Sequence, residues 1–223
     1  MEILYENKNC LAAVKPVGVL SQQGRRGEAD MVTLLTQTQK GTLGSIYLIH
    51  RLDKEVGGVM LFAKSHAAAS FYASAVENRK VCKEYLAVVR GTLDAPAGEW
   101  RDWLFRDETK HRTVTVDAHH KGAKEAQLRY KLLDTKLADG EPLSLLRIEL
   151  LTGRNHQIRV QCASRHLPLW GDGLYGNGER DGAPALFAWR LRFPEMAGGE
   201  KTVSALPSGG IWDRFSFADI LQT

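Results

Sequence analysis

The feature that most constrains the fold is an apolar run that begins directly after a glycine pair. Gly57-Gly58 is followed by Val59-Met60-Leu61-Phe62-Ala63 and then by Lys64. A short apolar run bounded by glycine predicts a buried strand, here from Gly58 to Lys64. The fold must therefore place this strand in a core.

The remaining pattern predicts more strands than helices. Asp30 is a candidate N-cap for a short helix through Leu35, and Ser65 for a helix with an apolar face from Ala68 to Val76. Asn155 is a candidate cap for a third helix that runs through Arg165. We expect the remaining strands at Leu11–Val14, Val81–Arg90, Trp100–Phe105, Arg112–Val116, Gln127–Leu133, Leu143–Leu150 and Phe187–Phe193, with Asp134-Thr135 among the turns. Strands that do not alternate regularly with helices indicate an α+β fold with a mostly antiparallel sheet.

A carboxylate surrounded by cations precedes the glycine pair. His50-Arg51-Leu52-Asp53 is followed by Lys54-Glu55-Val56. Nearby positive charge keeps a carboxylate ionised, so Asp53 is a candidate nucleophile or base acting on a polyanion. The alternative is a turn aspartate that pairs with Arg51 or caps local backbone.

A second cluster of cations and amides lies about a hundred residues later, and it decides between these alternatives. Thr152-Gly153-Arg154-Asn155-His156-Gln157-Ile158-Arg159 precedes Gly171-Asp172-Gly173-Leu174-Tyr175-Gly176. Three shorter motifs stand in the same series: Lys15-Pro16-Val17-Gly18, Ala63-Lys64 and Lys83-Glu84-Tyr85. Together these motifs resemble the RluA-type pseudouridine synthases, over about Leu4 to Phe193.

The resemblance implies a fold and a domain plan. It implies an α+β fold with a single catalytic domain over residues 1–223, built on a long bent mixed, mostly antiparallel sheet. Helices flank this sheet, and an RNA-binding cleft crosses its centre. Because Lys15-Pro16 comes so early, we expect no additional N-terminal RNA-binding domain.

The resemblance also assigns three catalytic roles. Asp53 either attacks ribose C1′ or removes the C2′ proton, and the sequence does not choose between these routes. Arg159 is expected to pair with Asp53 and to orient its carboxylate. Tyr85 is expected to stack on the flipped base, where aromatic stacking contributes ~1–3 kcal/mol, and to help move the C5 proton.

Five further residues are candidates for contact with RNA or the base. Arg51 is expected to fill the space that the flipped uridine leaves, and Arg154 to contact phosphate. Leu186 is expected to pack on the other side of the base. Lys15 and Lys83 either contact RNA or brace the cleft, whereas His50 is interpreted as structural.

The chain departs from the family pattern at three positions. Val56-Gly57 replaces the usual Thr-Ser, which removes two hydroxyls near Asp53. Phe187 stands where relatives often have His, and Asn155 where Thr or Ser is common. None of these positions belongs to the catalytic set, although the first puts the hydrogen bonding around Asp53 in doubt.

Composition is consistent with this interpretation. The net charge of +4 permits an RNA partner without requiring one. No apolar stretch approaches the ~20 residues of a membrane span. Three isolated cysteines indicate reduced thiols in a cytoplasmic protein, and adjacent His119-His120 lacks the further ligands of a metal site.

We therefore expect a monomeric RNA pseudouridine synthase, an isomerase acting on rRNA or tRNA without metal or other cofactor. One alternative is a catalytically inactive RNA-binding or RNA-folding module on the same scaffold. Another is a nucleosidase, but glycoside hydrolysis usually uses two carboxylates, and only one stands in a motif.

Overall fold

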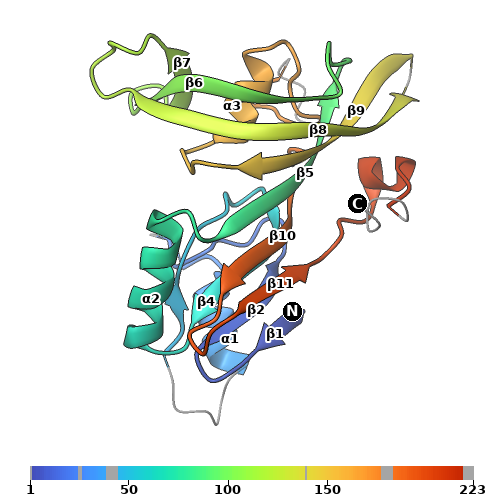
Figure 1. Ribbon diagram of the computed structural model, residues 1–223. Helices are drawn as coiled ribbons and strands as arrows, with labels where there is room; N and C mark the ends of the chain where they lie inside the picture. The colour runs from blue at the N-terminus through green and yellow to red at the C-terminus, as the bar shows by residue number, and fades with distance from the viewer. Residues whose placement is uncertain (1, 25–26, 39–44, 139, 177–182, 218–223) are drawn as a thin grey trace. The chain divides into compact units, whose positions relative to one another are not determined.

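The computed structural model describes residues 2–24, 27–38, 45–138, 140–176 and 183–217, which form two compact units (Figure 1). The first unit comprises Met1–Lys83 and Phe187–Pro207. The second comprises Glu84–Leu186 and Ser208–Thr223. Each unit is described by itself below.

The sheet of the first unit has the strand order β1-β2-β4-β10, with β3 pairing β4 and β11 pairing β10. All of these pairs are antiparallel except β4 with β10, where Gly57 and Gly58 face Phe187 and Ala188. The strands are β1 (Ile3–Glu6), β2 (Cys10–Lys15), β3 (Tyr47–Leu48), β4 (Gly57–Ala63), β10 (Leu186–Pro194) and β11 (Glu200–Ser204).

Strand β4 is the centre of this core, as its apolar sequence predicts. Every residue of β4 is buried. Val59, Leu61 and Ala63 pack with helix α2 (His66–Glu77), whose Tyr72 is fully buried. Ser65 caps α2 by accepting a hydrogen bond from the Ala68 N–H at 3.2 Å, which confirms the predicted N-cap.

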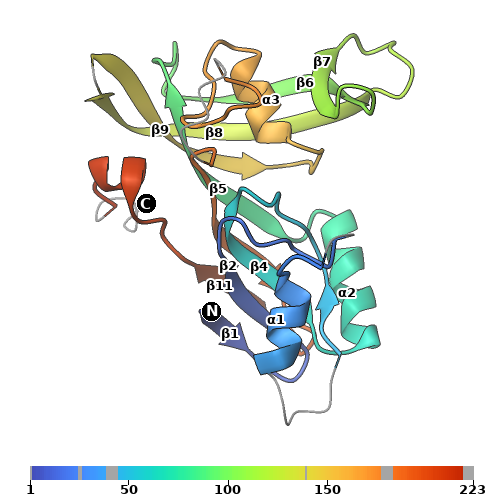
Figure 2. The same cartoon turned by 180° about the vertical axis from the view of Figure 1, so that it is seen from behind.

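Helix α1 (Met31–Thr38) covers the sheet on the side shown in Figure 2. Asp30 begins it as predicted, because its carboxylate accepts a hydrogen bond from the Thr33 N–H at 3.0 Å. The buried side chains of α1 are Met31 and Leu35. The first unit therefore has helices that pack on a sheet, rather than a regular β-α-β alternation.

The backbone geometry explains why the second residue of the glycine pair, Gly58, is a glycine. Its φ is +125°, and a Cβ there would lie 2.3 Å from the Ala188 carbonyl oxygen. Only glycine allows both this backbone conformation and so close an approach. Gly58 therefore permits β10 to pair with the beginning of β4.

The second unit contains a sheet in which β6 pairs β7 and β8, and β8 pairs β9, each antiparallel. Its strand order is β5-β9-β8-β6-β7. The strands are β5 (Cys82–Arg90), β6 (Ala97–Asp107), β7 (Arg112–Val116), β8 (Lys124–Ala138) and β9 (Glu141–Leu150), and a short 3₁₀ helix, η1, spans Gly210–Arg214. Strand β8 has fifteen residues and pairs with β9 along most of its length.

Helix α3 (Gln157–Ala163) lies on one face of this sheet (Figure 2). Val160 packs against Leu104 and Ala126, and the predicted inward residues Ile158 and Cys162 are buried. The predicted cap was wrong. His156, with φ of +53°, precedes the helix, and the Asn155 side chain instead accepts hydrogen bonds from Arg106 and Thr113, both at 3.0 Å.

Other differences concern strand ends and short edge strands. Asp134-Thr135 was predicted as a turn but lies inside β8, where the register shifts between Leu132 and Asp134. Such a bulge tolerates polar turn-forming residues within a strand. The short strands β1, β3 and β11 were not predicted. The α+β class with mostly antiparallel strand pairing is confirmed.

Candidate active site

Asp53 lies in the connection between β3 and β4. Exposure to solvent alternates along this connection. Arg51 is exposed, Leu52 is only 7 % exposed, and the exposure of Asp53 is intermediate. The Val56 N–H donates to the Asp53 carbonyl at 3.0 Å, which closes a tight turn before β4. The sequence thus anchors Leu52 in the core and leaves Arg51 accessible to a large ligand.

His50 is structural, as the sequence predicts. Its Nε2 accepts a hydrogen bond from the Leu61 N–H at 3.0 Å, which attaches the beginning of the turn to β4. Burial, with a smaller effect of the Lys83 charge, lowers the pKa of His50 to about 3. The imidazole is therefore neutral at physiological pH, as an acceptor at Nε2 requires.

Lys15 braces the same turn from the end of β2. Its side chain is 0 % exposed, and its ammonium donates to the carbonyls of Pro16, Val19 and Lys54 at 3.0, 2.6 and 3.1 Å. Burial lowers the pKa of Lys15 to about 8, although Asp53 and Glu55 oppose this shift. Of the two roles that the sequence left open for Lys15, these contacts support bracing.

Three predicted residues lie on or beside the strands. Tyr85 is in β5 and 6 % exposed, and Leu186 begins β10 and is 7 % exposed. Lys83 is also in β5, where burial lowers its pKa. Tyr85 and Leu186 are thus largely buried strand residues. The contacts of all three residues with RNA or a base stay predictions.

Arg159 is held by a partner that the sequence did not identify. Its Nε and Nη2 donate to the two carboxylate oxygens of Asp172, each at 2.7 Å. Asp172 also accepts the N–H groups of Leu174 and Tyr175 at 3.1 Å. Burial opposes ionisation of Asp172, but the hydrogen bonds and charge of Arg159 hold its pKa below the usual value.

Tyr175 connects the Arg159–Asp172 pair to strand β7. The Arg159 guanidinium lies 5.1 Å from the centre of the Tyr175 ring. The Tyr175 hydroxyl accepts the Thr113 N–H at 2.9 Å and lies 2.9 Å from Nδ1 of His156. Burial raises the pKa of Tyr175, so the phenol stays protonated at neutral pH. Asp172 and Tyr175 together fix the guanidinium; the predicted pair of Arg159 with Asp53 stays a prediction.

The start of the second motif is attached to β8. Gln157 is 3 % exposed; its amide donates to the Gln127 carbonyl at 3.0 Å and its oxygen accepts the Arg154 N–H at 3.0 Å. Arg154 also donates from Nε to the Glu125 carbonyl at 2.7 Å. Arg154 is half-buried, so its guanidinium is partly committed to the turn, and its phosphate contact stays a prediction.

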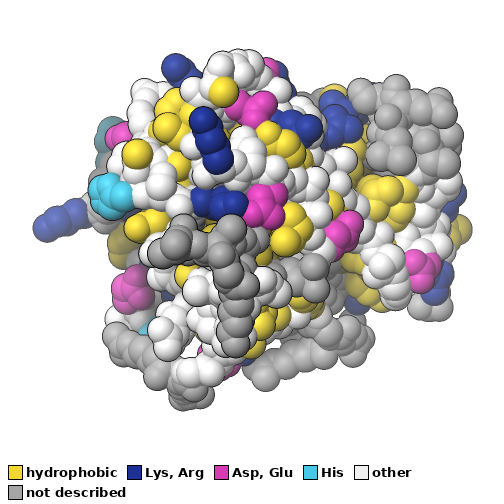
Figure 3. All heavy atoms as spheres, turned by 90° about the horizontal axis from the view of Figure 1, so that it is seen from below, with side chains coloured by type: hydrophobic (Ala, Val, Ile, Leu, Met, Phe, Trp, Pro, Cys, Tyr) yellow, Lys and Arg dark blue, Asp and Glu magenta, His cyan; other side chains and the backbone are white. Residues whose placement is uncertain are grey.

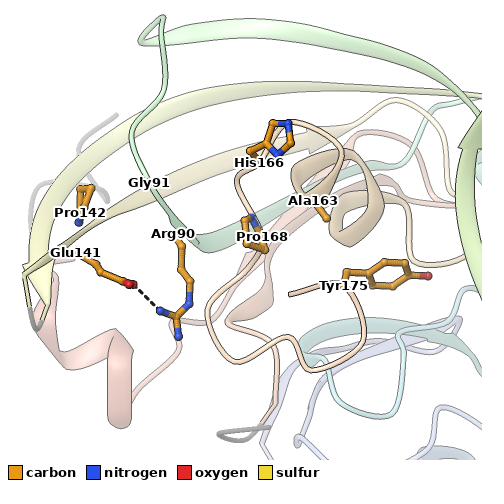
Figure 4. A pocket seen from close by; sticks show the side chains of 8 residues that line it. All are labelled: Arg90, Gly91, Glu141, Pro142, Ala163, His166, Pro168 and Tyr175. Atoms are coloured by element: carbon orange, nitrogen blue, oxygen red, sulfur yellow. Dashed lines mark hydrogen bonds and ion pairs between the residues drawn. The ribbon is translucent and has the colours of Figure 1, made fainter. Parts of the chain in front are cut away.

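A hollow of about 390 Å³ lies in the second unit, beside the Arg90–Glu141 ion pair (Figure 4). It is lined by Arg90, Gly91, Glu141, Pro142, Ala163, His166, Pro168 and Tyr175. The Tyr175 ring points away from that ion pair in Figure 4, and Tyr85 and Arg159 are not among the lining residues. The lining therefore does not include the residues predicted to hold the base.

Surface charge and candidate metal ligands indicate no further site within the described residues. On the face shown in Figure 3, lysine and arginine side chains are interspersed with acidic ones. Among the residues that the structure describes, no three His, Cys, Asp or Glu side chains gather to hold a metal ion. His119 and His120 are both exposed. No helix in the described ranges is long and apolar enough to cross a membrane.

Comparison with known proteins agrees with the sequence motifs. The family profile described as RNA pseudouridylate synthase matches residues 9–164, which include Asp53, Tyr85 and Arg159. The chain belongs to this family.

Two of the curated proteins to which this chain is similar are bacterial. It is 30 % identical over 183 residues to the Uncharacterized RNA pseudouridine synthase YhcT of Bacillus subtilis, covering 81 % of this chain and 59 % of the relative. It is 31 % identical over 182 residues to the Ribosomal large subunit pseudouridine synthase D of Borreliella burgdorferi, covering 78 % and 54 %. The chain therefore spans less than two thirds of the length of these relatives.

A solved structure supports the fold of the family member. The Human RNA Pseudouridylate Synthase Domain Containing 1 is similar with a TM-score of 0.75 and 25 % identity. The similarity covers 92 % of this chain and 83 % of the human chain.

The sequence did not assign roles to several residues that hold this site. Asp172, Tyr175 and Gln157 stand inside the quoted motifs, so their position was a usable signal. Ser21 carried no signal, because a single serine in a polar loop is common. Its contact with Leu52, described below, appears only in three dimensions.

Proposed function

We propose that this chain is an RNA pseudouridine synthase that converts uridine to pseudouridine with Asp53. The reaction breaks the bond from ribose C1′ to uracil N1 and joins C1′ to C5, while a proton leaves C5 and N1 takes one up. Atoms and electrons balance without an oxidant or a nucleotide. The chain has only to supply a carboxylate near the sugar and a pocket that holds the detached base.

The observation that carries the proposal is the Asp53 turn within a chain of this family. Its backbone is fixed by Lys15 and His50, while the neighbouring Arg51 is exposed. A carboxylate on a fixed stretch of backbone, beside an exposed guanidinium, suits attack on a nucleotide that has left its helix. A simple capping aspartate does not need an exposed arginine beside it.

The other residues take roles that fit their positions. We assign base stacking to Tyr85 and Leu186, which lie on strands, and the orientation of Asp53 to Arg159. Arg51 fills the vacated space in the RNA, and Arg154 and Lys83 contact its backbone. We further propose rRNA or tRNA as the substrate, with residues 1–223 acting as one catalytic domain of a monomeric cytoplasmic protein.

The test is Asp53→Asn, which keeps the shape of the side chain and removes its charge and basicity. RNA from cells lacking the gene is incubated with pure protein and mapped for pseudouridine. We expect wild type to restore at least one site and Asp53→Asn to restore none, with RNA affinity within about twofold. Asp94→Asn, at an exposed aspartate, is the matched control and should retain full activity.

Two outcomes would contradict the proposal. Wild-type protein that binds RNA but forms no pseudouridine would indicate an inactive RNA-binding module. Turnover by Asp53→Asn above a few per cent of wild type would remove Asp53 from the chemistry. Loss of cooperative unfolding in this variant would show instead that Asp53 is mainly structural.

A further inference from the structure

The segment Lys15–Ser21 holds the backbone on both sides of Asp53. On the C-terminal side, the Lys54 carbonyl accepts the Gly18 N–H at 2.8 Å and the Lys15 ammonium at 3.1 Å. On the N-terminal side, Leu52 is bonded to Ser21. Asp53 thus stands between two anchored residues, and the segment that anchors them lies more than thirty positions earlier in the chain.

The Ser21 contact is reciprocal. Its hydroxyl donates to the Leu52 carbonyl at 2.8 Å and accepts the Leu52 N–H at 3.0 Å. One hydroxyl therefore engages both backbone polar groups of the residue before Asp53. With both groups held, the Leu52 peptide units have little freedom to rotate, and the direction in which the next side chain leaves the backbone is fixed.

The contact is also buried. Ser21 is 5 % exposed and Leu52 7 % exposed, and the hydroxyl lies 3.7 Å from the Met60 sulfur in β4. Water has little access to replace the hydroxyl if it is removed, so the Leu52 N–H and carbonyl would lose a partner. Val56 and Gly57, at the end of the turn, carry no hydroxyl that substitutes for it.

We propose that Ser21 is a positioning residue for Asp53, acting through the Leu52 backbone. The role rests on the proposed function, because it concerns the rate of the same reaction. Misplacing a reacting group by about 1 Å costs roughly a hundredfold in rate. Removing the hydroxyl should therefore slow the chemical step roughly 10- to 100-fold and leave RNA binding nearly unchanged.

The test compares Ser21→Ala with Ser144→Ala. Ser144 is a fully buried serine in β9 whose hydroxyl donates to the Gly91 carbonyl at 2.7 Å, so it matches Ser21 in burial and in the loss of a backbone contact. Single-turnover rates are measured with enzyme in excess over an RNA that wild type modifies, and RNA affinity is measured separately. Amide hydrogen exchange at Leu52 reports the contact without any need for activity.

We expect Ser21→Ala to lower the single-turnover rate, to keep the RNA affinity within about twofold, and to speed exchange of the Leu52 N–H. Ser144→Ala should do none of these. Ser21→Thr, which keeps the hydroxyl, should recover most of the rate. If Ser21→Ala does not fold, Ser21→Cys takes its place, since a thiol is a weak hydrogen-bonding group of similar size.

Distinct results overturn the two proposals. An active wild type with equal rates for the Ser21 and Ser144 variants would refute the positioning role alone. A rate loss fully explained by weaker RNA binding, or a threonine variant as slow as the alanine variant, would refute it as well. Wild-type protein without any turnover would refute the proposed function, and the role of Ser21 in catalysis with it.

Discussion

The Asp53 turn and the Arg159 helix are held in different ways. Around Asp53 the anchors are hydrogen bonds to the backbone, made by Lys15, Ser21 and His50. Around Arg159 the anchor is a charged side-chain pair with Asp172. The first arrangement fixes where a side chain leaves the backbone, whereas the second fixes the functional group itself.

This difference follows from the length of the two side chains. An aspartate has two rotatable bonds, so fixing its backbone fixes most of its geometry. An arginine has a long flexible side chain, and fixing its backbone leaves the guanidinium free. A bidentate carboxylate is the efficient way to orient it.

The largest effect should come from breaking the Arg159 anchor. Asp172→Ala leaves a guanidinium buried without its bidentate partner, and we expect the free energy of unfolding to fall by about 3–5 kcal/mol. The measurement is urea denaturation followed by tryptophan fluorescence. Asp134→Ala, at an exposed pair with Lys136, should cost less than about 1 kcal/mol. Equal losses in the two variants would mean that Asp172 is not the main anchor.

The Asp53 turn should be sensitive to acid through His50. The folded pKa of about 3 is below the unfolded value, so the unfolded chain binds more protons between these values. Stability is therefore lost as the pH falls below the unfolded pKa of about 6.5. From about pH 7.5 to about pH 5, His50 alone should account for a loss of about 2 kcal/mol.

His50→Gln checks this expectation, because its amide oxygen can still accept the Leu61 N–H but does not titrate. Denaturation midpoints at the two pH values should differ less for this variant than for wild type. His119→Gln, at an exposed histidine, should keep the wild-type difference. An unchanged pH dependence in His50→Gln would show that other groups cause the acid sensitivity.

A smaller loss is expected at Tyr175, whose ring lies beside the Arg159 guanidinium and whose hydroxyl accepts the Thr113 N–H. Tyr175→Phe keeps the ring and removes the acceptor of the Thr113 N–H, and should cost about 1–2 kcal/mol. Tyr130→Phe, on strand β8, is the control and should keep the wild-type midpoint. If both variants keep wild-type midpoints, the hydroxyl contributes nothing to holding β7.

The smallest effect should be the alkaline response of the Lys15 brace. Above its pKa of about 8 the ammonium becomes an amine and loses one of three donors, while Asp53 and Glu55 are the charges that oppose this loss. Losing one hydrogen bond of ~1 kcal/mol corresponds to a roughly fivefold slower single-turnover rate. In Lys15→Arg the guanidinium stays charged, so this decline should disappear; an identical decline would assign it to the RNA or to another group.

The same contrast shows which contacts could be predicted from the sequence and which could not. Local signals succeeded where a neighbour in the chain supplies the partner: Ser65 caps α2 and Asp30 caps α1. The Asn155 cap failed because strands β6 and β7 engage its side chain from more than forty positions away. Whether the Asn155 side chain caps the helix or bonds to distant strands depends on tertiary structure, not on the local preference of asparagine.

The anchors of the site show the same limit. The motifs identified Asp53 and Arg159, yet neither Ser21 nor Asp172 was assigned a role. A buried lysine at position 15 was equally hidden, because lysine is normally exposed and only its three carbonyl partners explain its burial. The candidate catalytic residues can be identified from sequence motifs. The roles of the residues that hold them become visible only from their contacts in the folded structure.

The pairing of β4 with β10 has a consequence for biosynthesis. The chain leaves the first unit at Lys83 and returns to it only at Phe187, after the whole of Glu84–Leu186 has been made. Until then the beginning of β4, at Gly57 and Gly58, lacks its parallel partner on β10, although β2 and β3 have already been made. Such long-range pairing slows folding and exposes nascent chains to aggregation. Translation paused before β10 emerges should therefore leave a product that depends on chaperones.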